Sequence, residues 1–211
     1  MTGSTAEETV ARNYQYQLLL EVSQKLSATL EPAAILQAAV DGLTQLSGLD
    51  TAAVYLLADQ HLQLWATTPP LPPDFPDELR FTPLTQHPYA ERAITSSEPQ
   101  LLSDYLSANL TPTERLISEQ RNLRTALFVP LVAEDQVDGI FIVGSIAEPV
   151  AVSQEIIALS TTLSPLAALA VKNAKLYHDD RNRAAELQRT QLALQQKNQE
   201  LEQSVFPAQF G

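Results

Sequence analysis

The sequence has no cysteine among its 211 residues. This excludes disulfide bonds, thiolate metal sites, cysteine nucleophiles and thioether-linked chromophores. There are only six glycines, and no Gly-rich phosphate-binding loop is present. No apolar run approaches the ~20 residues that a membrane-spanning helix needs. We therefore expect a protein without a covalently bound chromophore, a phosphate loop or a membrane span.

Basic side chains are also scarce, since 13 Lys and Arg stand against 25 Asp and Glu, and the net charge is -12. Residues 1–170 hold 20 of the acidic side chains and 7 of the basic ones. Such a surface repels phosphate backbones and anionic lipids, so we expect no nucleic-acid or membrane partner. The N-terminal residues lack the basic and then apolar pattern of a signal peptide, and we expect a cytoplasmic location.

Helical and strand patterns alternate along the first half of the chain. Apolar residues recur every four positions over residues 14–30, and a second helical pattern runs from Pro32 to a C-terminal cap at Gly48. Residues 51–67 alternate with a period of two around a polar turn, which predicts a β-hairpin. Five of the eight residues 69–76 are proline, which predicts an extended exposed loop.

The second half predicts short strands and helices followed by one long helix. In chain order we expect a strand at 80–82, a helix at 87–97, a strand at 100–102, a lid-like helical segment at 105–122, strands at 127–129 and 140–143, and a helix from Ser153 to about Gln203. Pro165 lies inside the last of these and should bend it. About 50 helical residues span roughly 75 Å, which exceeds what a domain of this size needs.

A heptad pattern occupies the end of this helix. Leu187, Leu194 and Leu201 are spaced by seven and fit position d. The a positions are then Tyr177, Ala184, Gln191, Asn198 and Val205. Leucine at d with one asparagine at a is typical of a parallel two-stranded coiled coil. We expect these residues to join two copies of the chain in a parallel homodimer. The alternative is that this segment forms a single solvated amphipathic helix.

Three stretches resemble the GAF domain family. Val129-Pro130-Leu131, followed by Gly139-Ile140, is similar to the two adjacent central strands of that family. Residues 98–104, Glu-Pro-Gln-Leu-Leu-Ser-Asp, resemble the stretch after its middle helix. Residues 167–177 resemble its closing helix, which ends in Asn-Ala-x-Leu-Tyr in many members. The three stretches occur in the family's order, and the resemblance covers residues 15–178.

This resemblance implies an α+β fold, an α/β/α sandwich. A central antiparallel sheet of five or six strands would carry helices on both sides, and the chain would end in a long C-terminal helix. The terminal helices of the family commonly form a parallel bundle in a dimer, which adds Leu18 and Val22 to the expected interface. The other face of the sheet would carry loops that close over a small-molecule pocket.

Departures from the family narrow the choice of ligand. Bilin-binding members attach their chromophore through cysteine, and members that reduce methionine sulfoxide also need cysteine, so both are excluded. Members that bind cyclic nucleotides carry an Asn-Lys pair after the central strands, whereas residues 144–150 have none. We expect no cofactor from these classes. Haem remains a candidate ligand because histidine is an adequate axial ligand, and another small molecule remains a candidate too.

Eight residues are candidates for the pocket lining: Phe81, His87, Asp104, Tyr105, Arg115, Arg124, Phe128 and Phe141. Each of these residues also has a purely structural interpretation. The aromatic residues fit a simple core, and Asp104 fits a cap for the helix after it. Arg115, Arg121 and Arg124 form an anion clamp or, as we favour, a charged helix face. The three histidines lack metal-ligand spacing, and we favour solvated or capping roles for them.

We therefore expect a non-catalytic regulatory domain of a signal-transduction protein. It would bind a small ligand or a partner and relay a change through dimeric terminal helices to an output domain, namely a histidine kinase of a two-component system, a cyclase or a phosphatase. A purely structural dimerisation module without a ligand is the alternative. The expected divisions are a flexible N-terminus (1–12), the sensor domain (13–178), a coiled-coil signalling helix (179–205) and a tail or truncated output domain (206–211).

Overall fold

The computed structural model of the chain describes residues 32–134 and 136–205. The helix expected over residues 14–30 lies outside this part, as do Leu18, Val22 and the expected tail 206–211. The side chains of four further interface candidates also lie outside it, namely Tyr177, Ala184, Asn198 and Leu201.

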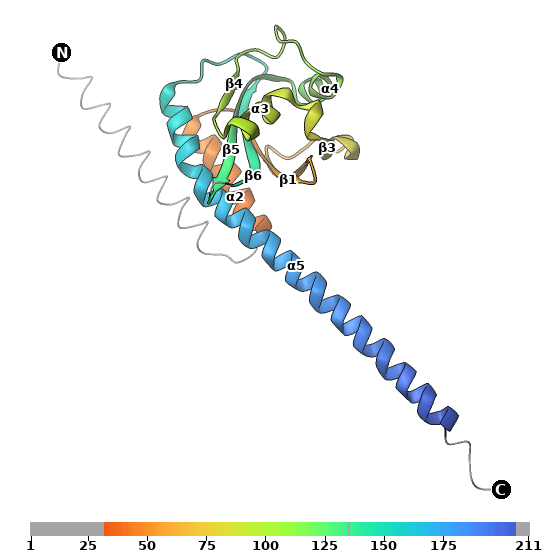
Figure 1. Cartoon of the computed structure of the whole chain (residues 1–211). Helices are drawn as coiled ribbons and strands as arrows, with labels where there is room; N and C mark the ends of the chain where they lie inside the picture. The colour runs from red at the N-terminus through yellow and green to blue at the C-terminus, as the bar shows by residue number, and fades with distance from the viewer. Residues whose placement is uncertain (1–31, 135, 206–211) are drawn as a thin grey trace, which may run out of the picture. The chain divides into compact units, whose positions relative to one another are not determined.

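Six antiparallel strands form one sheet in the order β3–β2–β1–β6–β5–β4 (Figure 1). Their bounds are β1 (Thr51–Ala58), β2 (His61–Thr68), β3 (Phe81–Pro83), β4 (Gln100–Leu102), β5 (Leu123–Ala133) and β6 (Gln136–Ile146). The expected antiparallel sheet is confirmed. The two central strands β5 and β6 are longer than the sequence predicted, because their polar ends lack the dense β-branched pattern of their middles.

Helices cover both faces of this sheet. Their bounds are α2 (Pro32–Ser47), α3 (Pro88–Ser96), α4 (Pro112–Arg121) and α5 (Gln154–Val205), with 3-10 turns η1 (Asp77–Leu79) and η2 (Leu84–Gln86). α2 and the first turns of α5 pack on one face, and α3 and α4 lie over the other (Figure 1). The predicted α/β/α sandwich is confirmed.

Local signals account for the first elements. Pro32 begins α2, where its missing N–H costs no helical hydrogen bond. Gly48 ends it with a φ of 67°, and its N–H donates to the Thr44 carbonyl at 3.0 Å. The β1–β2 hairpin turns through Asp59 and Gln60, which both have positive φ, as a two-residue hairpin loop requires.

Alternation along the central strands creates two separate cores. In β1, Val54 points to the α2 side of the sheet and Tyr55 points to the α3 side. The register between β5 and β6 pairs Phe128 with Ile142 and Val129 with Phe141. Because directly paired residues share a face, Phe128 and Ile142 lie on the α3 side, whereas Phe141 lies on the α2 side.

The chain divides after Lys172 into two compact units. Within the first unit, Ala167 of α5 packs with α2 residues on the sheet. The Ser164 hydroxyl donates to the Pro130 carbonyl of β5, and the Lys172 ammonium pairs with the Glu134 carboxylate. These contacts seat the first turns of α5 on the sheet. The coiled coil and the domain boundaries expected from the sequence stay predictions.

Candidate ligand pocket

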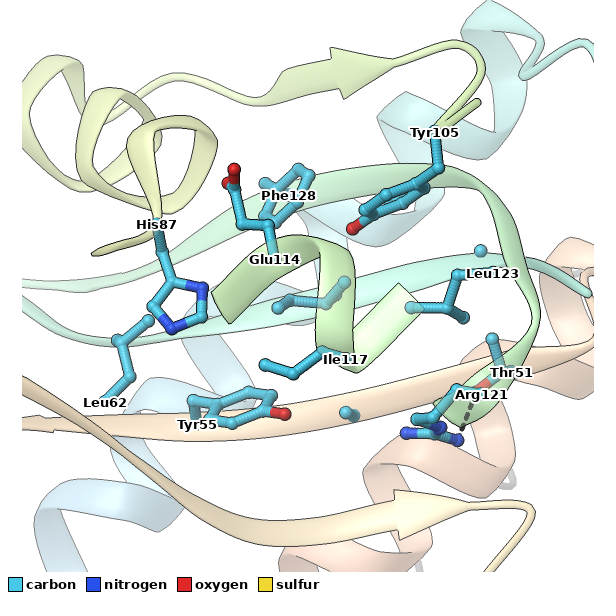
Figure 2. Close-up of a pocket in the computed structure, with 14 residues that line it drawn as sticks. Thr51, Tyr55, Leu62, His87, Tyr105, Glu114, Ile117, Arg121, Leu123 and Phe128 are labelled. Atoms are coloured by element: carbon cyan, nitrogen blue, oxygen red, sulfur yellow. Dashed lines mark hydrogen bonds between the residues drawn. The ribbon is translucent and has the colours of Figure 1, made fainter. Parts of the chain in front are cut away.

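A largely enclosed cavity lies between the sheet and α4, on the α3 side (Figure 2). Its volume is about 40 Å³. Its apolar wall is formed by Ala53, Leu62, Ile117, Leu123, Ala126, Phe128, Ile142 and Gly144. Its polar groups are Thr51, Tyr55, His87, Tyr105, Glu114 and Arg121. A mostly apolar hollow with a few polar groups pointing into it is the usual form of a small-molecule site.

Helix α4 forms the roof of the cavity, and a capping box fixes where it begins. The Glu114 N–H donates to the Thr111 hydroxyl at 3.1 Å, and the Thr111 N–H donates to the Glu114 carboxylate at 3.1 Å. The Tyr89 N–H in the first turn of α3 also donates to this carboxylate. Burial raises the pKa of Glu114, against the effect of these hydrogen bonds. Glu114 therefore joins the N-termini of α3 and α4.

Arg121 closes the other end of the cavity. Its guanidinium donates to the hydroxyls of Thr51 and Thr67, both at 2.8 Å. Both hydroxyls donate in turn to backbone carbonyls of the β1–β2 hairpin. Within the described residues no carboxylate forms an ion pair with Arg121. Burial lowers the pKa of Arg121, but an arginine stays charged at neutral pH. The site thus holds a positive charge whose hydrogen-bond partners, among the described residues, are neutral hydroxyls.

Two tyrosine side chains enter the cavity from opposite walls (Figure 2). Tyr55 comes from β1, and Tyr105 follows β4, where its N–H donates to the Arg124 carbonyl at 2.8 Å. Each tyrosine is only 6% exposed. Burial raises the pKa of both phenols, against the effect of nearby Arg121. Both are therefore neutral hydroxyls that can donate a hydrogen bond into the cavity.

His87 lies at the start of α3 and is 8% exposed. Its Nε2 shares a 2.7 Å hydrogen bond with the Thr82 hydroxyl of β3. Burial lowers the pKa of His87 to about 4. It is a buried neutral imidazole at physiological pH, so the solvated or capping role favoured from the sequence is wrong for this residue. Its side chain makes no capping hydrogen bond to α3.

Three of the eight pocket candidates line the cavity: His87, Tyr105 and Phe128. Phe81 does not, because it lies on edge strand β3, is 50% exposed and stacks on the His61 ring. Phe141 does not, because the strand alternation turns it into the core on the α2 side. Both aromatic residues are therefore corrected to structural positions.

The charged candidates also lie elsewhere. Asp104 pairs with Arg124 at 3.3 Å and accepts the Leu106 N–H, so it holds a turn. Neither Asp104 nor Arg124 lines the cavity. The expected cap is wrong as well, because the next helix begins at Pro112 and its N-cap is Thr111. Arg115 lies on the exposed side of α4, at an open surface hollow.

The sequence interpretation leaves out Glu114 and favours a charged helix face over an anion clamp for Arg121, although a signal that places both in the site is present. Thr111-Pro112-Thr113-Glu114 is a capping box with proline at the first helical position. Once it sets the start of α4, Glu114, Ile117 and Arg121 fall on one face at the i, i+3, i+7 spacing. Arg115 then falls on a different face.

The cavity sets limits on what it holds in this conformation. Its volume of about 40 Å³ is far below the roughly 300 Å³ at which sites for drug-sized ligands begin. A haem or a bilin would therefore require α4 to move away. No cluster of potential metal ligands occurs among residues 32–134 and 136–205. In the same part of the chain, no helix has the length and hydropathy for a membrane span.

The fold is shared with solved GAF domains. The GAF domain of a phosphoenolpyruvate-protein phosphotransferase from Coxiella burnetii has 18% identity and a TM-score of 0.67, over 80% of this chain and 98% of its own. A GAF domain/HD domain protein from Geobacter sulfurreducens has 25% identity and a TM-score of 0.61, over 72% and 98%. The blue-light absorbing PixJ GAF domain from Thermosynechococcus elongatus has 20% identity and a TM-score of 0.54, over 73% and 91%. Comparison with curated protein sequences found no match.

The sequence itself also carries the family signature. The family model for the GAF domain matches residues 29–172, which is more than half of the chain and includes every strand of the sheet. This range agrees with the resemblance seen in the central strands and the closing helix. The chain belongs to the GAF domain family, a family of sensory and regulatory domains in signalling proteins.

Proposed function

We propose that this chain is a non-catalytic sensor domain that binds a small ligand beneath α4 and relays a change through dimeric terminal helices to an output domain. The observation that carries the proposal is the cavity with Tyr55, Tyr105 and Arg121 in its wall. Their polar groups have spare hydrogen-bonding capacity inside an otherwise apolar enclosure. Histidine kinase, cyclase and phosphatase domains are the outputs that we expect.

The sheet offers a direct route from the cavity to the terminal helices. Ile142 of β6 lines the cavity, while its neighbours Phe141 and Val143 pack with α2 on the other face. On that face Ser164 of α5 contacts strand β5. A ligand that shifts β5 and β6 would therefore shift the seating of α5. The shift is limited to the ligand's differential affinity for the two states, typically about 1–3 kcal/mol.

The protonation states of the cavity support the proposed non-catalytic role. The imidazole of His87, with a pKa of about 4, is a weak general base at neutral pH. The Glu114 carboxylate is engaged by backbone N–H groups. Tyr55 and Tyr105 stay protonated because burial raises the pKa of each. These states suit recognition of a ligand better than proton transfer to it.

The dimer is proposed from the exposed leucines of α5. Leu187 is 71% exposed and Leu194 is 60% exposed, and both fit position d of the heptad pattern. A second copy would bury them in a parallel coiled coil. Gln191 at position a weakens such a coil, and a weak coil can shift between two packings.

The experiment is native mass spectrometry of the full chain, which reports subunit number and retained small molecules together. We expect a dimer with a bound small mass. Leu194→Glu should yield monomers, whereas Leu192→Glu should not, because Leu192 is similarly exposed at 54% but lies off the seam. A dimer without bound mass that also binds no added ligand would instead favour a structural dimerisation module. A monomer would remove the relay.

A further inference from the structure

The charge balance of the cavity restricts its ligand. Arg121 is a partly buried guanidinium that, within the described residues, contacts only the hydroxyls of Thr51 and Thr67. These bonds use two of its five N–H donors. The one carboxylate in the wall, Glu114, lies seven residues away on α4, or roughly 10 Å along the helix, and is engaged by backbone N–H groups. The positive charge of Arg121 is therefore available to a negatively charged group of a ligand.

The neighbouring hydroxyls add donors to the same space. The side-chain hydroxyls of Tyr55 and Tyr105 make no hydrogen bond among residues 32–134 and 136–205, although each residue is only 6% exposed. Tyr55, Tyr105 and Arg121 line the same cavity (Figure 2). These hydroxyls line the cavity, and an acceptor oxygen placed there would take a hydrogen bond from each of them.

We infer that the cavity binds a short-chain carboxylate, with its carboxylate group on Arg121 and the two tyrosine hydroxyls. This inference rests on the proposed ligand-sensing function. A single positive charge matches a monoanion, whereas a dianionic phosphate would bring an uncompensated charge into an apolar enclosure. The rest of the wall, including Leu62, Ile117 and Phe128, suits an aliphatic tail. Even a tail of a few carbons exceeds the cavity volume of about 40 Å³, so such a ligand requires α4 to move outward.

The binding test compares butyrate with butyramide, which has nearly the same shape but no charge. The full chain is titrated with each at constant ionic strength, by ligand-observed NMR and calorimetry. A charge-assisted hydrogen bond predicts a preference of about tenfold to hundredfold for butyrate. Inorganic phosphate is the third probe and should bind more weakly than butyrate.

Variants locate the binding. Arg121→Gln should reduce butyrate affinity about tenfold or more, while Arg115→Gln, on the exposed side of the same helix, should leave it unchanged. Since loss of Arg121 also frees α4 from the β1–β2 hairpin, Tyr105→Phe is the second variant. It removes one hydroxyl and keeps the ring, and it should weaken butyrate about fivefold.

The outcomes distinguish failure of the carboxylate assignment from failure of the proposed sensing function. Equal affinity for butyrate and butyramide, or butyrate affinity that does not change in Arg121→Gln, overturns the carboxylate assignment and leaves a ligand-binding cavity. Phosphate binding without butyrate binding also overturns it. If no member of a mixed panel of neutral and anionic fragments binds the wild type, the sensing function fails as well.

Discussion

Protonation of His87 should destabilise this domain in mild acid. Its imidazole is buried against Thr82, and its pKa lies near 4 in the folded chain instead of the usual 6.5. The unfolded chain therefore binds more protons than the folded chain between these pH values. Stability should be complete above pH 6.5 and fall as the pH drops through 6.5 toward 4.

The size of this loss follows from the two pKa values. Integrating the proton-binding difference gives a loss of about 2 kcal/mol between pH 7 and pH 5, and about 3 kcal/mol by pH 4. Above pH 5, most of the loss of stability is determined by the pKa of His87 in the unfolded chain. The loss therefore changes little if the pKa in the folded chain is nearer 5. Glu114, which also lines the cavity, acts in the opposite direction because its pKa is raised on folding.

Urea unfolding at pH 7, 6 and 5 measures the effect, at one protein concentration because a dimer's apparent stability depends on it. The comparison is with His87→Gln, since a glutamine amide can reach Thr82 from the position of Nε2 but does not titrate. The difference between the two chains cancels all other groups. If both chains lose the same stability from pH 7 to pH 5, His87 is not held neutral by burial and the derivation fails. An NMR titration of the imidazole should independently give a midpoint near 4.

Three substitutions test the assignment of faces and strand spacing. Phe141 has 0% exposure, so Phe141→Ala should lower the free energy of unfolding in urea by about 3–5 kcal/mol. Phe81 is 50% exposed, so Phe81→Ala should lower it by less than about 1 kcal/mol. Similar losses of stability in the two variants would contradict the assignment of faces. Gly144→Ala should destabilise the domain by about 1–3 kcal/mol or more, because its Cβ would lie 2.2 Å from the Thr125 carbonyl oxygen. A neutral Gly144→Ala would show that β5 and β6 can separate locally.

The elements of this fold were readable from the sequence, but the faces of its sheet were not. Alternation predicted the hairpin of residues 51–67 and the central strands, because strand periodicity is local. β1, β5 and β6 are apolar on both faces, however, so alternation alone does not say which side holds a pocket. Phe128 and Phe141 looked equivalent for that reason. Only the β5–β6 register, which pairs Phe128 with Ile142, separates them.

The positions of the candidate-site residues likewise have either local or long-range causes in the sequence. The start of α4, and with it the face shared by Glu114 and Arg121, follows from a capping box within four residues. Burial of His87 does not follow from its neighbours in the sequence, because residues far away in the chain, such as Leu62 and Ile117, line the same cavity. The partner of Asp104 is Arg124, twenty residues away.

The last prediction concerns the opening of α4, which a ligand larger than the cavity requires. The buried residues of α4 are Glu114 and Ser118, both polar, and its apolar contact with the cavity is the half-buried Ile117. Local opening costs little where few apolar contacts are lost. Amides of α4 should therefore exchange with solvent at least about tenfold faster than those of β6, a difference of about 1.4 kcal/mol.

Hydrogen exchange measured by mass spectrometry tests this prediction. Ile117→Ala should speed exchange in α4 further and leave β6 unchanged, since only the helix loses its apolar contact. Bound ligand should slow exchange in α4, because the ligand joins the helix to Tyr55 and Tyr105. If α4 and β6 exchange at the same rate in the free chain, α4 opens only when the whole domain unfolds. Ligand entry would then need a route that leaves Arg121 and its threonine contacts in place.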